Sequence, residues 1–80
     1  MKRLMRRTEL ARALGTTPPT VKYYTSLGLF PVEKKTDHGQ YLYNYEAVKG
    51  RYVRILELKE KRLRIDEIKD RLRIEVLIQN

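Results

Sequence analysis

Apolar residues near the N-terminus recur at intervals of three and four, which is the spacing of one face of a helix. They are Leu10, Ala13 and Leu14, with Thr8 placed as an N-cap before them and Gly15 as a stop after them. The pattern therefore predicts a first short helix between Thr8 and Gly15.

A second helix is predicted by the stretch "TTPPTVKYYTSLGLF" that follows. Thr17 is its N-cap, Pro18 suits the first helical position because the N–H that proline lacks would be unpaired there, and Pro19 is tolerated in the same turn. Gly28 ends this helix. Two short helices so close together predict a helix-turn-helix over residues 8–28.

The period of the pattern changes to two in the next segment, residues 31–44. Tyrosines alternate with other side chains over residues 41–45, which is typical of a strand. A partner strand at residues 32–35 and a turn at residues 37–39, in which Gly39 supplies a positive φ, complete a β-hairpin. A hairpin behind a helix-turn-helix is a wing.

Two further helices are predicted over residues 45–72, with Asn44 as the first N-cap and Gly50 weakening the middle of the first helix. The apolar stripe of that helix is Val48, Tyr52, Ile55, Leu56 and Leu58, and that of the next is Ile65, Ile68 and Leu72. We expect the two helices to pack as an antiparallel pair. Residues 73–80 fit a strand as well as a continued helix. The predicted fold is mostly α: four helices, with a small β-hairpin between the second and third.

Composition and charge narrow the function. The 80 residues make one small domain, and the absence of cysteine excludes disulfides, thiolate metal sites and thiol redox sensing. No apolar run resembles a signal peptide or a membrane span, so we expect a cytoplasmic, nucleoid-associated protein. The net charge is +8, and residues 1–50 carry nine basic against four acidic side chains. This excess in the first half favours a polyanionic partner, double-stranded DNA above all.

The residues and their spacing resemble the DNA-binding domain of the MerR family of bacterial transcription regulators, a winged helix-turn-helix. The stretch "TELARALG" resembles the first helix of the family pattern. Seven residues occupy the positions of the pattern for the second helix and the glycine that ends it: Thr20, Val21, Lys22, Tyr23, Tyr24, Gly28 and Leu29. The wing "HGQYLYN" and the stretch "LRIDEIKDRL" resemble later family motifs, so the resemblance covers residues 8–72 in order. It implies a dimer that bends promoter DNA.

The chain departs from the family pattern at several positions. Lys22 replaces an arginine, Thr25 a glutamate, and Arg62 the glycine between the third and fourth helices. In the wing, Gln40 and Tyr41 stand where the family has tyrosine and arginine, so its usual basic wing contact is missing there. Lys34 and Lys35 on the facing strand are the alternative source of that charge.

Candidate DNA contacts follow from these positions. The start of the second helix faces a phosphate, while Pro19, Thr20 and Lys22 lie where base edges or a thymine methyl would be. Tyr23 offers its phenol to a phosphate, with packing over the first helix as the alternative. The full candidate set is Thr17, Pro18, Pro19, Thr20, Lys22, Tyr23, Lys34, Lys35, His38, Gln40 and Tyr41. Because Tyr41 and Tyr43 point to the same side of their strand, a shared role facing the core is the simpler interpretation of that pair.

Three hypotheses for function remain. The first is a sequence-specific transcription regulator or its isolated DNA-binding domain, and a minimal regulator would act as a homodimer joined through residues 74–78 or as a monomer that DNA arrays. The second is a small architectural DNA-binding protein, of excisionase or nucleoid-anchoring type, and the third is a protein or RNA interaction module. We expect no enzyme, metal or cofactor, because there is no catalytic set or glycine-rich phosphate loop and His38 is the only histidine. No small-molecule effector is evident.

Overall fold

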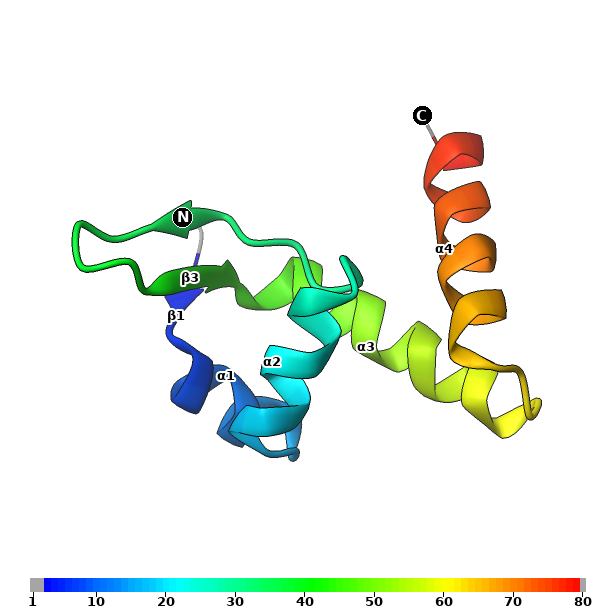
Figure 1. The fold of residues 1–80 in the computed structure, drawn as a ribbon, viewed down its shortest axis with the longest axis horizontal. Coiled ribbons are helices and arrows are strands. Elements are labelled where there is room, and N and C mark those ends of the chain that lie inside the picture. Colours follow the sequence, from blue (N-terminus) through cyan, green and yellow to red (C-terminus); the bar gives the residue numbers. More distant parts are fainter. Residues whose placement is uncertain (1–2, 80) are drawn as a thin grey trace.

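The computed structural model describes the backbone of residues 3–79 and the side chains of residues 3–75, which form four helices around a small sheet (Figure 1). In chain order the elements are β1 (Leu4–Met5), α1 (Arg7–Leu14), α2 (Pro18–Ser26), β2 (Lys34–Lys35), β3 (Tyr41–Asn44), α3 (Tyr45–Glu60) and α4 (Ile65–Gln79). The predicted fold class, mostly α with a wing between α2 and α3, is confirmed.

The sheet has one strand more than predicted. Its order is β1-β3-β2, both pairs are antiparallel, and Leu4 lies opposite Asn44 at the β1 edge. β1 was not predicted from the sequence, because two residues are too few to show a period. β2 is also shorter than the predicted strand at residues 32–35, although the Glu33 N–H already donates to the Leu42 carbonyl across 2.9 Å.

The helix ends follow local rules with one correction. α1 begins at Arg7, and the Glu9 carboxylate accepts the Arg6 N–H at 3.2 Å, so the predicted N-cap at Thr8 is wrong. Glu9 caps the helix start because a carboxylate at the third helical position can accept the unpaired N–H of the residue that precedes the helix. The predicted stop at Gly15 is confirmed by its φ of +74°.

The core joins side chains from every helix and from β1 and β3. Its buried members are Met5, Leu10, Ala11, Val21, Tyr24, Leu29, Phe30, Tyr43, Val48, Ile55, Leu58, Ile68 and Leu72. Two predicted core positions are wrong: Ala13 is exposed while Ala11 is buried, and Leu56 is 42% exposed. The spacing of apolar residues indicates which side of a helix is apolar, but the elements that pack on the helix decide which residues of that side are buried.

The C-terminal half differs from the predicted antiparallel pair. α4 continues as a helix through Gln79, so the helical interpretation of residues 73–79 is the right one. Figure 1 shows α4 (orange to red) rising from the loop at a wide angle to α3 instead of lying antiparallel along it. The Arg54 guanidinium of α3 binds the Glu75 carboxylate of α4 through three hydrogen bonds of 2.6–3.1 Å. Asn80 and the side chains of residues 76–79 lie outside the described part of the chain. Most of the predicted dimerisation segment, residues 74–78, is therefore described by its backbone alone.

Candidate DNA interface

The N-terminus of α2 is held by a pair of threonines. The Thr17 Oγ1 accepts the Thr20 N–H at 3.4 Å, and the two hydroxyl oxygens lie 2.9 Å apart. Pro18 and Pro19 fill the first two helical positions, as the sequence predicted. The start of α2 is therefore ordered before any ligand arrives, although the Thr20 hydroxyl is engaged with Thr17.

The middle of α2 divides into an inner and an outer face. Val21 and Tyr24 are buried, and the Tyr24 hydroxyl accepts a hydrogen bond from Lys59 Nζ at 3.3 Å. Lys22 is exposed and Tyr23 is 51% exposed, with its ring centroid 5.6 Å from that of Tyr24. This geometry leaves an ammonium group and a phenol free to meet a ligand beside the helix start.

The wing ends in a closed turn organised by Thr36. Its N–H donates to the Gln40 carbonyl at 2.7 Å, its carbonyl accepts the Gly39 N–H at 2.9 Å, and its hydroxyl accepts the Gln40 N–H at 3.0 Å. Gly39 has a φ of +81°, as the predicted turn requires. These bonds hold His38 and Gln40 at the exposed tip.

Tyr41 and Tyr43 do not share one role. Tyr43 is fully buried, and its hydroxyl lies 2.8 Å from the Thr25 Oγ1, which donates its own proton to the Val21 carbonyl at 2.7 Å. Tyr41, two residues nearer the wing tip, is 37% exposed, and the Lys35 ammonium lies 5.9 Å from its ring centroid. The predicted core role is therefore right for Tyr43 and wrong for Tyr41.

Two adjoining clefts lie between the start of α1, α2 and the wing. We call them the Arg6 cleft, of about 410 Å³, and the Lys22 cleft, of about 380 Å³. The Arg6 cleft is lined by Arg6, Arg7, Thr8, Pro18, Gly39, Gln40 and Tyr41. The Lys22 cleft is lined by Arg7, Lys22, Thr25, Ser26, Gly39 and Tyr41. No acidic side chain lines either cleft, and both combine cations with hydroxyl groups, which are the groups that bind phosphate oxygens.

The clefts bring together only part of the candidate set. Four of its members line them: Pro18, Lys22, Gln40 and Tyr41. The others lie around the start and outer face of α2 (Thr17, Pro19, Thr20, Tyr23) or on the wing outside the cleft linings (Lys34, Lys35, His38).

Six further lining residues had no binding role predicted from the sequence: Arg6, Arg7, Thr8, Thr25, Ser26 and Gly39. The available signal was the pair of consecutive arginines directly before the first helix. Arg6 and Arg7 follow β1, and the wing turn precedes β3. The two segments are far apart in the sequence, and the pairing of β1 with β3 brings them together in the fold.

Within residues 3–79, no helix has the length and apolar character needed to cross a membrane. Over the same residues, no group of three or more His, Cys, Asp or Glu side chains is arranged to hold a metal ion.

A helix-turn-helix with a hairpin wing and a third and fourth helix behind it defines the winged helix-turn-helix class. The chain belongs to the MerR HTH family of regulatory proteins, whose family model matches residues 5–74. It is similar to the HTH-type transcriptional regulator CueR of Bacillus subtilis (strain 168), with 42% identity over 64 residues. That match covers 80% of this chain and 43% of the relative, so the chain spans less than half the length of CueR.

Proposed function

We propose that this chain binds duplex DNA with sequence preference, as the DNA-binding unit of a MerR-type transcription regulator. The observation that carries the proposal is a basic surface without acidic lining residues. It lies where Arg6 and Arg7 at the start of α1, Lys22 of α2 and the wing turn meet. Membership of a regulatory helix-turn-helix family and the similarity to a transcriptional regulator support it.

The proposed contacts fall into two kinds. Lys22, next to Pro19 and Thr20, reads base edges in the major groove, which a helix can enter. Tyr23 and the N-terminus of α2 at Thr17 bind phosphates and fix the register of the complex without reading sequence. On the wing, Lys34, Lys35, His38, Gln40 and Tyr41 meet the backbone beside the groove that α2 enters.

The first test separates base contacts from phosphate contacts. Lys22→Ala should weaken binding to a preferred duplex more than binding to random DNA, whereas Tyr23→Phe should weaken both alike. Preferred duplexes are obtained by selection from a random pool and sequencing, and affinities by fluorescence anisotropy. Equal losses for the two variants would show that the assignment of bases to Lys22 and phosphate to Tyr23 is wrong.

The second test concerns the clefts. Arg7→Gln should weaken binding to all sequences and reduce the magnitude of the salt slope by about one. The matched control is Arg12→Gln, because Arg12 is exposed on the same helix and lines neither cleft. If about six phosphates are neutralised, the logarithm of affinity should fall with the logarithm of salt at a slope of roughly −5. A flat salt response would refute DNA binding and favour a protein partner.

The arrangement of selected sites tests the homodimer. Inverted repeats with fixed spacing would support a dimeric regulator, since half-site symmetry mirrors protein symmetry. Direct or irregular repeats would favour the architectural alternative.

A further inference from the structure

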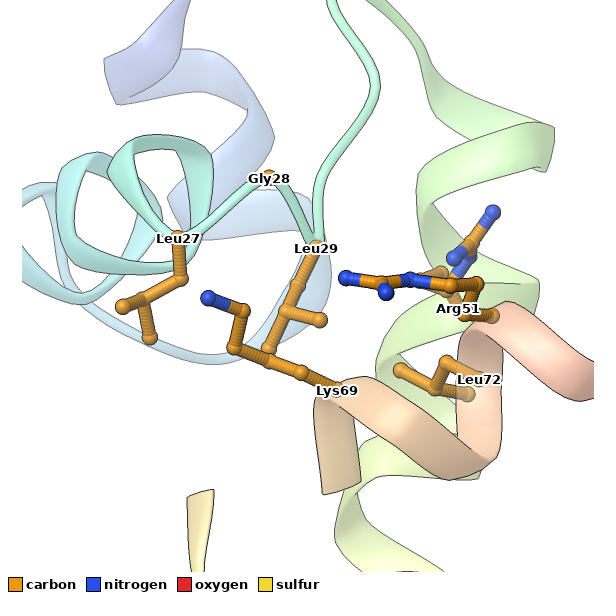
Figure 2. A pocket seen from close by; sticks show the side chains of 7 residues that line it. Leu27, Gly28, Leu29, Arg51, Lys69 and Leu72 are labelled. Carbon is orange, nitrogen blue, oxygen red and sulfur yellow. The ribbon is translucent and has the colours of Figure 1, made fainter. Parts of the chain in front are cut away.

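A second basic surface lies just beyond the C-terminal end of α2, whose N-terminal start carries the proposed base and phosphate contacts. It is an open pocket of about 410 Å³, which we call the rear pocket (Figure 2). Its lining residues are Leu27, Gly28, Leu29, Arg51, Lys69, Leu72 and Arg73. They come from the loop after α2, from α3 and from α4, so only the folded domain assembles the pocket.

The rear pocket concentrates positive charge, and no acidic residue lines it. Its cations are Arg51, Lys69 and Arg73, and none of the three makes a hydrogen bond or ion pair with another residue of the described chain. The Glu75 carboxylate interacts electrostatically with Arg51, but it is already bound by the Arg54 guanidinium. Like charges gathered in this way repel one another, so an anion that enters the pocket gains attraction and relieves that repulsion.

The floor of the rear pocket is apolar. Leu29 and Leu72 are each 3% exposed, and Leu27 is half-buried beside them. Figure 2 shows the Lys69 side chain reaching from α4 toward Leu27, over this floor. A side chain added at Gly28 would meet no atom within 4 Å, so the backbone of a bound chain can approach there closely. Cations around leucines match a segment in which carboxylates alternate with apolar side chains.

The position of the rear pocket separates it from the DNA contacts. It shares no lining residue with the Arg6 or Lys22 cleft. The nine residues of α2 place its two ends about 13 Å apart. Contacts at the start of α2 therefore leave the lining of the rear pocket unused, although Ser26 of the Lys22 cleft directly precedes Leu27.

We propose that the rear pocket docks an acidic, leucine-containing segment of a partner protein, with its carboxylates on Arg51, Lys69 and Arg73. This docking does not depend on the proposed DNA binding, because it uses a separate set of side chains. If the chain sits on DNA, the pocket would hold a second protein beside it.

The test is an NMR titration of the ¹⁵N-labelled 80-residue chain with a synthetic peptide of alternating Glu and Leu. We expect shifts concentrated at the amides of Leu27, Gly28 and Leu29. The double variant Lys69→Gln/Arg73→Gln should bind the peptide about tenfold more weakly, since each exposed ion pair contributes up to about a factor of five.

A matched double variant controls for net charge. Lys61→Gln/Arg64→Gln also removes one lysine and one arginine, both exposed and outside the rear pocket, and it should retain the affinity within about twofold. Equal losses in the two double variants would refute the proposal, because they would indicate general electrostatic attraction. Shifts confined to the wing or to the start of α2 would also refute it.

Three further measurements decide the occupant. A peptide with Gln in place of Glu should not bind, and binding by it would exclude carboxylate recognition. Hexanoate should bind far more weakly than the peptide, and equal binding would reassign the rear pocket to small acids. Duplex DNA should leave the peptide bound, whereas displacement from the rear pocket would assign it to the DNA backbone. A chain that fails to bind DNA but still binds the peptide would refute only the proposed function.

Discussion

Arg62, in the loop between α3 and α4, has a left-handed backbone with a φ of +60°. It stands where the MerR pattern has glycine. The conformation is required by the end of α3, because the Arg62 N–H donates to the Lys59 carbonyl at 2.9 Å and the next N–H, that of Leu63, donates to the Leu58 carbonyl at 3.4 Å. A residue with a Cβ is strained in this region by roughly 1–2 kcal/mol.

Arg62→Gly should therefore stabilise the domain. The substitution relieves the strain but makes the unfolded chain more flexible, which costs about 0.4–1 kcal/mol, so we expect a net gain of about 0.5–1 kcal/mol. No side-chain hydrogen bond or ion pair is lost among the described residues, because the exposed Arg62 side chain forms none with them. For a domain of this size the gain corresponds to about 2–8 °C in Tm.

The assay is urea unfolding of the unmodified chain, Arg62→Gly and Arg62→Ala, followed by circular dichroism. Arg62→Ala removes the same charge and side chain but keeps the Cβ, so it separates the backbone effect from the loss of a cation. We expect Arg62→Gly to be the most stable of the three. An Arg62→Gly variant no more stable than Arg62→Ala would refute the argument that the left-handed backbone carries the strain.

Three more predictions concern stability. Thr25→Val should destabilise the domain by about 1–3 kcal/mol, because it leaves the buried Tyr43 hydroxyl without its partner. Urea unfolding measures the loss, and a loss of the same size in a Tyr43→Phe background would contradict this cause. Gly50→Ala should stabilise by about 0.5–1 kcal/mol, since Gly50 lies in the interior of α3 and an added Cβ meets no atom within 4 Å. A lower Tm would contradict it. The hydrogen bonds from Arg54 lower the pKa of Glu75 below its ordinary value of 4.5. Because the unfolded chain then binds more protons, this stabilisation is present above pH 4.5 and is lost as the pH falls through the lowered folded-state pKa. Urea unfolding across that range should show the advantage over Glu75→Gln shrinking on the acid side, and a constant advantage would exclude titration of Glu75.

Local chemistry explains what the sequence predicted well. Helix starts at Thr17 and Asn44 depend on a side chain that accepts a backbone N–H within three residues, and both caps are present in the structure. The stops at Gly15 and Gly28 and the turn at Gly39 depend on a positive φ, which all three have. Such signals are complete within a few residues, so they can be read without knowing the fold.

The features that the sequence did not predict require partners far along the chain. The alternation of Tyr41 and Tyr43 correctly places both on one side of β3, but only Tyr43 is buried with its hydroxyl on Thr25 of α2, whereas Tyr41 lines an open cleft. Burial thus depends on how neighbouring elements pack against the strand, and the period of a strand carries no information on that packing. The same reason hid the proposed role of Arg7, which follows β1 and lines both clefts beside Gly39 of the wing turn. A binding surface built from three separated segments is a property of their packing, so the clefts, and with them the proposed phosphate contact of Arg7, become visible only once the fold is known.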